Sequence, residues 1–513
     1  IPRNEPGVYD MLCRGDSIGV FQVESRAQIG ALPRLKPRCF YDLAVEIGLI
    51  RPGPVQGGAV HPYIRRRTGV EPVTYPHPLL EPVLERTLGI PLFQEQLMQM
   101  ATTVGNCTAA DADLLRRAMG SKRGVERIDS LRTKLFEGMA ANGIDDDTAQ
   151  GIYARIESFA NFGFAESHAL SFAGLVYTSA WIKLHYPAVF LAALLRSQPM
   201  GFYSSATLVA DARRHGVVTR RPDVARSSVG ADLELLDACC EELGSEELET
   251  GIDECLHDHD ESEIGAFDPN RDDGDHRRDT HFAVRLGLSD VSGINIETAT
   301  RIVEERERES FASLDDLARR VDLSGEEGEA LALAGAFDDL VGSRRGALWQ
   351  IGQINGVAPG QLDVQVVTQP PLLPEPTQME LLGDDLRATG ISTADHPVRQ
   401  VRDALNRRGV VQVDRLDGVE TRRRIEVAGV VTHRQRPGTA GGVTFLNLED
   451  ETGLLNVIVT PGAWRHYRRV ARTSRALVVR GILERGDEGV MSLQADRLEA
   501  LDLSVPTKSR DFR

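Results

Sequence analysis

A long acidic stretch in the middle of the sequence holds most of the net negative charge of the chain. Residues 237–280 contain 17 Asp or Glu residues against 3 Arg residues, a net charge of −14 within a chain of net charge −17. Apolar periodicity is almost absent there, and so polar and charged a segment cannot bury enough apolar surface to fold. We therefore predict an acidic, disordered linker over residues 226–281. The remainder is close to neutral, so local basic patches can bind a polyanion.

The region before the linker, residues 1–225, carries the signals of α-helices. Within residues 126–143, the apolar residues Ile128, Leu131 and Leu135 lie on one helical face, and a glycine ends the pattern. Residues 172–195 are richly apolar and predict a pair of helices separated at Pro187, because proline cannot continue a helix. We expect a mainly α-helical N-terminal part.

From Arg424 onward the apolar period changes to two, which indicates β-strands. The strand patterns are separated by turn residues, and one helix-like segment interrupts them at residues 461–471. This order predicts an all-β OB-fold barrel over residues 421–503, followed by a short tail over residues 504–513. Such a barrel commonly binds single-stranded nucleic acid on one face. A structural barrel with a charged rim fits the composition equally well.

Residues 282–350, between the acidic linker and the barrel, predict a helix–hairpin–helix region. They contain Gly293-Ile294-Asn295, where the usual hairpin has glycine at both outer positions. Such a hairpin presents backbone N–H groups at a helix N-terminus to a DNA phosphate. Because asparagine tolerates the left-handed conformation, we predict that the turn survives with a weaker phosphate contact. Residues 351–420 include a Pro-rich run and predict a second linker.

A group of basic residues stands out at LLRRAMGSKRG, residues 114–124. The guanidinium groups of Arg116 and Arg117 at a helix end can grip phosphates bidentately, and Lys122 adds a further positive charge. Gly120 and Ser121 allow backbone N–H groups to approach an anion as well. The alternative interpretation is a solvent-exposed helix face that binds nothing.

Three other groups of reactive residues have plainer explanations. Asp111 and Asp113 could hold two Mg²⁺ ions, but residues two apart on a helix diverge by about 200 degrees, which favours a helix cap. Ser167 and His168 are adjacent, whereas a nucleophile and its base must meet in space. The third group has adjacent cysteines and an H-x-H pair, which fit a zinc site poorly; it comprises Cys239, Cys240, Cys255, His257 and His259.

Five longer segments resemble, in their order and spacing, the C-family DNA polymerases of bacteria, the family of the DNA polymerase III alpha subunit. They are GVFQVESRAQ (19–28), IRPGPVQGG (50–58), PLFQEQLMQMA (91–101), DADLLRRAMGSKR (111–123) and GFAESHALSFA (163–173). The form ESHALSFA is similar to the error-prone branch of that family, as are QPMGFY (198–203), ADARRHGV (210–217) and the ending SRDFR. The resemblance covers nearly the whole chain except the acidic linker.

The family order implied by this resemblance is a PHP domain, a palm with an inserted thumb, fingers, a helix–hairpin–helix region with a clamp-binding region, and an OB-fold. On this order the chain enters at the fingers, with palm-edge residues at its start, and residues 351–420 hold a clamp-binding-like region. The family's three catalytic aspartates lie in the palm, upstream of Gly19, and their flanking pattern has no counterpart here. We therefore expect no catalytic or metal-binding residue within this chain, which alone would be inactive.

Roles for individual residues follow from these matches and from the basic start of the barrel. The expected nucleotide-binding residues are Arg116, Arg117, Lys122, Ser167 and His168. The residues expected to shape the fingers are Gln22, Glu24, Ser25, Arg51, Gln94, Glu95 and Gln96. The expected DNA-binding residues are Gly293, Asn295, Arg422, Arg423, Arg424 and Arg434.

The implied function is DNA-directed DNA polymerisation of the error-prone type, in damage-induced mutagenic repair and translesion synthesis. The implied cofactor is Mg²⁺, bound by palm residues, and the substrates are dNTPs. The implied partners are primed template DNA, single-stranded template, and a sliding clamp reached through accessory mutasome proteins. We expect a bacterial cytoplasmic protein, because no apolar run is long enough to span a membrane. The alternative is a non-catalytic DNA-binding module derived from such a polymerase.

Overall fold

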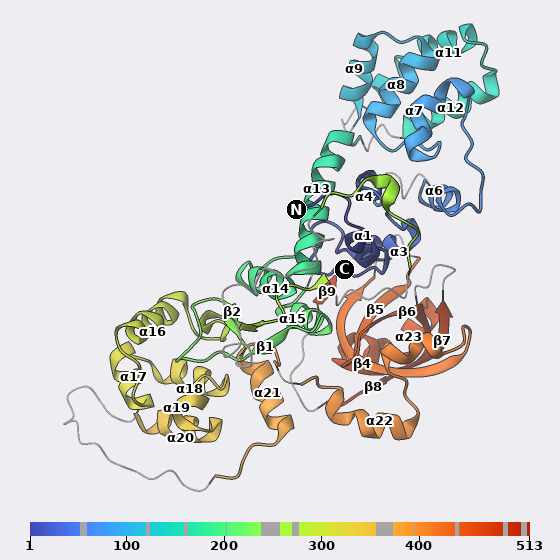
Figure 1. Ribbon diagram of the computed structural model, residues 1–513. Coiled ribbons are helices and arrows are strands. Elements are labelled where there is room, and N and C mark those ends of the chain that lie inside the picture. Colours follow the sequence, from blue (N-terminus) through green and yellow to red (C-terminus); the bar gives the residue numbers. More distant parts are fainter. Residues whose placement is uncertain are drawn as a thin grey trace. The chain divides into compact units, whose positions relative to one another are not determined.

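The computed structural model separates the chain into two units, which are coloured along the sequence in Figure 1. One unit comprises Ile1–His185 with Glu249–Arg277, and the other comprises Tyr186–Leu248 with Arg278–Arg513. The first unit therefore includes part of the acidic stretch, and the second unit takes sequence from both sides of it. The structure describes residues 1–51, 59–119, 124–158, 163–201, 203–236, 257–268, 276–354, 373–393, 395–436, 441–485, 491–503 and 510–512.

The described part of the first unit is helical, as predicted for the N-terminal region. Its elements are α1 (Pro6–Cys13), α2 (Arg26–Ile29), α3 (Leu32–Leu35), α4 (Phe40–Leu49), α6 (Val60–Arg67), η1 (Pro78–Leu80), α7 (Glu81–Leu84), η2 (Glu85–Thr87), α8 (Gln94–Gly105), α9 (Ala109–Ala118), α10 (Gly124–Asp129), α11 (Arg132–Ala141), α12 (Asp146–Ser158), α13 (Glu166–His185) and η6 (Glu261–Glu263). None of the helices that the structure describes is both long enough and apolar enough to cross a membrane.

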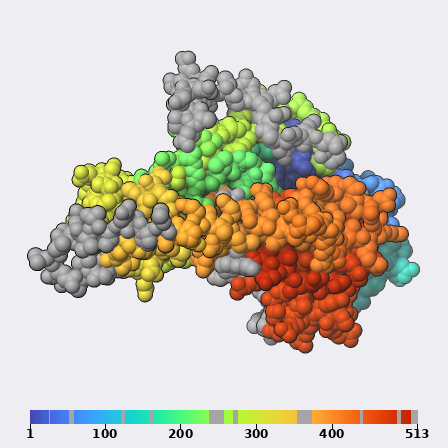
Figure 2. Space-filling view, turned by 90° about the horizontal axis from the view of Figure 1, so that it is seen from below, coloured from blue at the N-terminus to red at the C-terminus, as the bar shows by residue number. Residues whose placement is uncertain are grey.

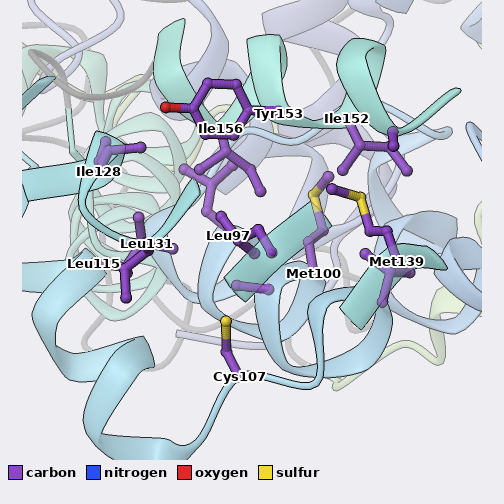
Figure 3. Close-up of a cluster of buried hydrophobic side chains, with 14 of the residues drawn as sticks. Leu97, Met100, Cys107, Leu115, Ile128, Leu131, Met139, Ile152, Tyr153 and Ile156 are labelled. Atoms are coloured by element: carbon purple, nitrogen blue, oxygen red, sulfur yellow. The ribbon is translucent and has the colours of Figure 1, made fainter. Parts of the chain in front are cut away.

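Helices α8 to α12 surround one apolar core, part of which is drawn in Figure 3. Ile128, Leu131 and Leu135 are all buried in it, as their spacing predicts. The single helix predicted over residues 126–143 is nevertheless interrupted between α10 and α11. At the break, the Ser130 hydroxyl donates to the backbone oxygen of Arg127 at 2.6 Å, a local bond that competes with the helical pattern.

Helix α13 packs against α4 and α1 in the same unit. It ends at His185, and α14 begins at Pro187, so the predicted pair of helices separated by proline is confirmed. The last turn of α13 buries Lys183, whose Nζ donates to Oδ1 of Asp16 at 2.7 Å and to the backbone oxygen of Ile18 at 3.1 Å. A buried ammonium group is tolerated there because it is paired and hydrogen-bonded.

The second unit contains the remaining elements. They are α14 (Pro187–Arg196), α15 (Ser205–Arg214), β1 (Val218–Arg220), β2 (Asp232–Leu235), β3 (Phe282–Arg285), η8 (Leu288–Asp290), α16 (Ile296–Arg308), α17 (Leu314–Val321), α18 (Gly325–Leu333), α19 (Asp338–Val341), α20 (Arg344–Ile354), α21 (Gln378–Ala388), η9 (Arg399–Val401), α22 (Arg402–Arg408), η10 (Val413–Gly418), β4 (Arg424–Gln435), β5 (Thr444–Glu449), β6 (Leu454–Val459), α23 (Pro461–His466), α24 (Arg468–Thr473), β7 (Ala476–Arg485), β8 (Met491–Ala500) and β9 (Arg510–Phe512).

Parts of residues 226–281 have defined places, so the prediction of a disordered linker over this range is wrong for them. Strand β2 pairs antiparallel with β3, which also pairs in parallel with β1. Residues 258 and 259 are hydrogen-bonded to the start of the chain. The His259 N–H donates to the Arg3 oxygen at 2.9 Å, and the Arg3 N–H donates to Oδ1 of Asp258 at 2.8 Å. Hydrogen bonds position these residues where apolar burial is scarce. Residues 237–256 and 269–275 lie outside the described residues.

Helices α16 to α20 share a second apolar core with residues such as Leu288, Ile302, Leu317 and Phe337. Helix α17 shows why these helices form: Leu314, Leu317, Ala318 and Val321 repeat at helical spacing and are all buried, while its exposed face is charged. The side chain of Ser313 caps its first turn by accepting from the Asp316 N–H at 3.1 Å. This is the region predicted as helix–hairpin–helix.

Five strands close into a barrel in the order β5-β6-β8-β7-β4, with β4 pairing back onto β5. The β6–β8 pair is parallel and the other pairs are antiparallel, and α23 and α24 lie in the connection between β6 and β7. This is the connectivity of the predicted OB-fold, although the single predicted internal helix is two short ones. Gly481 lies at a register shift, where a Cβ atom would be 2.3 Å from the Gln494 oxygen.

Residues before and after the barrel extend it. Val398 and Leu405, from the segment that includes α22, pack with Val430 and Val478 on the outside of the barrel. In Figure 2 this segment is orange, and the barrel runs from orange to red along the sequence. In the predicted tail, β9 pairs in parallel with His433–Gln435 of β4, so part of the tail adds a strand to the sheet.

Candidate functional site

The basic pair Arg116 and Arg117 lies on the last turn of α9, and both side chains are exposed. Arg116 donates through NH2 to Oδ1 of Asp113 at 2.9 Å, and Arg117 lies 2.8 Å from Oδ2 of the same carboxylate. Exposed ion pairs of this kind contribute about 0–1 kcal/mol, so a stronger anion can displace the carboxylate at little cost. Two guanidinium groups are thereby held side by side at a helix end. Lys122, Gly120 and Ser121 lie outside the described residues.

The neighbouring Asp111 has a separate task, at the start of α9. Its Oδ2 accepts from the Thr108 N–H at 2.7 Å, and the Thr108 hydroxyl accepts from the Asp111 N–H, which is a capping box. A hydrogen bond from Lys134, together with those from Thr108, lowers the pKa of Asp111 to about 2. Asp111 and Asp113 are thus committed to different cations, which supports the cap interpretation over a paired metal site.

The end of α9 touches the segment that leads into α13. Gly163 lies so close to Met119 that a Cβ atom there would be 2.5 Å from the Met119 Cβ. Met119 follows the helix that carries Arg116 and Arg117, and Gly163 precedes Ser167 and His168 by one turn or so of chain. Two of the sequence motifs therefore meet in space at a contact that only glycine permits.

Ser167 and His168 lie on the first turn of α13, and both are exposed. The His168 ring lies between Phe164 and Phe172, with ring centroids 5.4 and 4.1 Å away, and Phe21 lies 5.2 Å beyond Phe172. We call these four side chains the aromatic row. The Ser171 hydroxyl donates to the backbone oxygen of Ser167 at 2.9 Å. The His168 ring therefore presents a surface for stacking. Among the described residues, no hydrogen bond joins Ser167 to His168 in the way that a nucleophile is joined to its base.

The segment before α13 is held by two of the predicted fingers motifs. The Gln94 N–H donates to the Phe164 oxygen at 2.9 Å, and Oε2 of Glu95 accepts from the Glu166 N–H at 2.9 Å. The Arg51 guanidinium lies over the Phe164 ring at 4.4 Å and donates to the backbone oxygens of Gly48 and Leu92, each at 2.7 Å. Burial lowers the pKa of Arg51 to about 10. The rest of the Arg51 motif, residues 52–58, lies outside the described residues.

Gln96 differs from its neighbours because its side chain is buried. Its Oε1 accepts from the N–H groups of Leu92 and Phe93, and its Nε2 donates to Thr87 Oγ1 at 2.8 Å and to the Val83 oxygen at 3.2 Å. All these bonds lie within the protein. Gln96 therefore stabilises the start of α8. The Gln94 backbone and the Glu95 side chain instead hold the segment before α13 through hydrogen bonds.

The motif at residues 19–28 reaches the same helix. The Phe21 N–H donates to the Ser179 hydroxyl of α13 at 3.1 Å, and Gln22 is exposed with a left-handed φ of 64°. Burial raises the pKa of Glu24. The Ser25 hydroxyl donates to Oε1 of Gln28 at 2.8 Å. Gln22 is the member of this group that faces solvent beside the aromatic row.

The hairpin before α16 differs from its prediction in one respect. Gly293 takes the left-handed conformation, with φ of 97°, whereas Asn295 is extended, with φ of −88° and ψ of 166°. Asn295 is instead the N-cap of α16, and its Oδ1 accepts from the Thr298 N–H at 2.8 Å. Asparagine stands here because it caps, and the left-handed turn needs only the first glycine.

The arginines at the start of the barrel separate into two groups. Arg422, Arg423 and Arg424 are exposed, and Arg424 pairs with Asp496 at 2.8 Å. Arg434 is buried: its Nε donates to the Ala471 oxygen at 2.9 Å, and it also bonds the Ser474 oxygen. These bonds tie β4 to the segment around α24. The structure thus gives Arg434 a role within the barrel, where a DNA contact was predicted.

Two groups of residues were missed by reasoning from the sequence. A cavity of about 470 Å³ in the second unit is lined by residues of α15, of 386–397, and of β4 and β5, among them Arg213, His396 and Glu449. Burial lowers the pKa of His396 to about 4 and raises that of Glu449 to about 7. The second group is Glu5, His185 and His276 in the first unit. No local pattern could reveal either, since their members are far apart in the chain.

Three regions of this chain match domain families that are known from other proteins. Residues 1–143 match the finger domain of the bacterial DNA polymerase III alpha subunit, residues 216–347 match a helix-hairpin-helix motif, and residues 425–501 match an OB-fold nucleic acid binding domain. Error-prone DNA polymerases of Mycolicibacterium paratuberculosis and Nocardia farcinica are each 50% identical over 99% of this chain. That of Corynebacterium glutamicum is 48% identical over 99%.

A finger domain, a helix–hairpin–helix region and an OB-fold in one chain define a part of a bacterial DNA polymerase III alpha-type protein. The similarity to the three relatives runs through all of these regions, and the chain spans 43%, 41% and 44% of their lengths. The chain belongs to the error-prone branch of the bacterial C-family of DNA polymerases.

Proposed function

We propose that this chain is the finger-to-OB-fold part of a DNA-directed DNA polymerase of the error-prone type. It handles the incoming dNTP and the primed template during damage-induced mutagenic repair and translesion synthesis in the bacterial cytoplasm. Residues 1–225 are the fingers, residues 282–350 and the barrel bind DNA, and residues 351–420 hold the clamp-binding-like region. A sliding clamp is reached through accessory mutasome proteins.

The observation that carries the proposal is the contact between Met119 and Gly163. It joins the exposed guanidinium pair on α9 to the aromatic row at the start of α13. A nucleoside triphosphate has the two matching parts, since its phosphates need cations and its base offers a flat face for stacking. The alternative interpretation, a solvent-exposed basic helix face that binds nothing, does not account for the neighbouring aromatic surface.

In this proposal the chain's residues bind and orient the nucleotide. Arg116 and Arg117 leave the Asp113 carboxylate and take up the triphosphate, which exchanges a weak surface pair for bidentate contacts with a more highly charged anion. His168 and Phe164 lie where a base can stack, and Ser167 offers a hydroxyl beside them. Arg51, Gln94 and Glu95 hold this segment in place through the bonds described above.

Nucleotidyl transfer in such polymerases uses Mg²⁺ ions held by carboxylates. Asp111 and Asp113, the paired carboxylates nearest to the basic pair in sequence, do not fit such a site. Lys134 and Thr108 occupy the first, and the two arginines occupy the second. The metal carboxylates are therefore expected in the palm, which precedes the fingers in the order of domains typical of the family.

The second unit supplies the DNA contacts in the proposal. The N-terminus of α16, which follows Gly293 and is capped by Asn295, presents backbone N–H groups suited to a phosphate. Arg422, Arg423 and Arg424 form an exposed basic start to the barrel. Contacts of this kind follow the DNA backbone and are independent of base sequence, as a template-directed enzyme requires.

The experiment measures binding of dNTP, and of labelled primed DNA, by the 513-residue chain and its variants. Arg116→Ala and Arg117→Ala each remove hydrogen bonds to a charged group, worth about 1.5–3 kcal/mol, so nucleotide affinity should fall roughly 10- to 150-fold. Arg132→Ala is the matched control, because Arg132 is an equally exposed arginine of the same unit, paired with Asp129. Gly163→Ala should also weaken nucleotide binding, without any change of charge.

If all four variants bound the nucleotide with the affinity of the wild-type chain and still bound DNA, the proposed role of Arg116 and Arg117 in nucleotide binding would be contradicted. Such a result would favour the alternative of a non-catalytic DNA-binding module. Primer extension by the wild-type chain alone, lost in the Asp111→Asn and Asp113→Asn variants, would contradict the assignment of the metal carboxylates to the palm.

A further inference from the structure

We propose that Glu5, His185 and His276 form a binding site for a single zinc ion, which fastens the acidic stretch to the helical unit. All three residues belong to the unit made of Ile1–His185 and Glu249–Arg277, and one ligand atom of each lies within 4.8 Å of the others. They come from three places in the chain: Glu5 precedes α1, His185 ends α13, and His276 belongs to the acidic stretch. The proposal is independent of the nucleotide site.

The hydrogen bonds of His185 require a proton or a metal ion between its ring and the Glu5 carboxyl group. Its Nδ1 lies 2.8 Å from the backbone oxygen of His276, which can only accept, so Nδ1 carries the hydrogen. Its Nε2 lies 2.8 Å from Oε1 and 2.9 Å from Oε2 of Glu5, and a carboxylate also only accepts. A neutral imidazole has a single N–H group. Either a second proton or a metal ion must therefore lie between Nε2 and the carboxylate.

The position of His276 favours the metal ion over the proton. Its Nδ1 lies 3.5 Å from Oε1 of Glu5, on the carboxylate that already faces His185. Two ligand atoms of a tetrahedral zinc ion, with bonds of about 2.0–2.1 Å, are about 3.3 Å apart. The separations of 2.8 and 3.5 Å lie on either side of this value. A proton shared by Glu5 and His185 needs no third donor, whereas a metal ion does.

The surroundings hold the donors as the outer partners of a metal site do. The hydrogen bond from His185 Nδ1 to a backbone oxygen leaves Nε2 as the ligand atom, and Trp181 Nε1 donates to Oε2 of Glu5 at 2.7 Å. Glu5 is 1% exposed and His185 is fully buried, so an uncompensated carboxylate would be costly there. Gly7 leaves room for the ring, since a Cβ atom there would be 2.7 Å from Nε2 of His276.

Two imidazole nitrogens and one carboxylate oxygen make a donor set that suits Zn²⁺, with water completing the tetrahedron on the open side. The His276 side chain is 17% exposed, which provides that side. The same stretch already bonds the chain start through Asp258 and His259. A zinc ion would add a strong, reversible attachment at His276, so residues 257–268 would be held more firmly to the helical unit when zinc is bound.

The test uses the 513-residue chain with Cys239→Ser, Cys240→Ser and Cys255→Ser, so that the cysteines of the acidic stretch cannot bind the metal. After removal of metals with EDTA, ZnCl₂ alone is titrated calorimetrically, and CoCl₂ is used to record the visible spectrum of the bound ion. We expect one ion per chain and a tetrahedral cobalt spectrum without the charge-transfer bands of thiolate ligation. Zinc should also protect residues 257–268 from hydrogen exchange.

His276→Ala is the main variant because its side chain is partly exposed and its loss should leave the fold intact, as far-UV circular dichroism would verify. It removes a direct ligand, so zinc affinity should fall by more than the roughly 10- to 100-fold seen when an outer partner is removed. Glu5→Gln should act likewise. His259→Ala is the matched control: His259 lies in the same stretch, beside Glu263, outside the proposed donors. Three results would each overturn the proposal: absence of stoichiometric zinc, wild-type zinc affinity in His276→Ala, or loss of zinc binding in His259→Ala. Absence of zinc would mean that a proton, and not a metal ion, lies between Glu5 and His185.

Discussion

Replacing Glu449 with glutamine should stabilise the barrel at neutral pH. Glu449 is the last residue of β5 and is buried, and burial raises the pKa of its carboxyl to about 7 from an ordinary value near 4.5. Below pH 4.5 the carboxyl is protonated in both the folded and the unfolded chain. Between pH 4.5 and 7 the unfolded chain loses this proton first, so the free energy of unfolding falls as pH rises, and above pH 7 the penalty is constant.

The magnitude follows from the size of the shift. About 2.5 pKa units at about 1.36 kcal/mol each give a penalty of about 3–4 kcal/mol above pH 7. Glu449→Gln keeps the size of the side chain and removes its titration. The gain in stability should therefore approach that value at pH 8 and vanish at pH 4.

Hydrogen exchange of the β5 and β6 amides between pH 4 and 8 is the suitable assay, because it reports the opening of the barrel itself in a chain with more than one folded unit. Glu484→Gln is the matched control, since Glu484 is an exposed glutamate of the same barrel. The reasoning is refuted if the wild-type chain and the Glu449→Gln variant lose stability with the same slope between pH 4.5 and 7.

Two further predictions concern the helical unit that carries the basic pair. Leu115→Ala should lower the free energy of unfolding of that unit by about 2–5 kcal/mol in urea denaturation, because Leu115 is fully buried in the core of Figure 3. The half-exposed Leu175 should tolerate the same change within about 0.5 kcal/mol, and similar losses at both positions would contradict the assigned core. Thr108→Ala should cost about 1 kcal/mol, since it removes the cap of α9. Thr103→Ala, on the exposed side of α8, should cost less, and an equal cost would argue against the capping box.

Features set by neighbouring residues were predictable from the sequence. Strands β4 and β7 lie in the region from Arg424 onward where a period of two predicted strands, because alternation of apolar and polar residues acts through the two faces of a strand. The helix break at Pro187 follows from the missing N–H and the fixed φ of proline. The order of the motifs likewise indicated the polymerase family before any geometry was known.

Features set by contacts between distant segments were decided by the tertiary structure alone. Arg434 looks like its neighbours Arg422 to Arg424 in the sequence, but strand curvature and closure of the barrel bury it against the Ala471 and Ser474 oxygens. The order in parts of the predicted linker, residues 226–281, depends on partners such as Arg3 and β3, which composition cannot reveal.

The two sites proposed for this chain show the same division. The sequence indicated a helix end at Arg116 and Arg117, because helical signals are local, whereas the helix that carries Ser167 and His168 was predicted only from residue 172 onward. Only the packing of Met119 against Gly163 brings those helices together, and only the tertiary fold places Glu5, His185 and His276 around one point. The physical reason is that a residue's own neighbours select its backbone conformation, whereas side chains separated by tens or hundreds of residues meet only after the cores between them have packed.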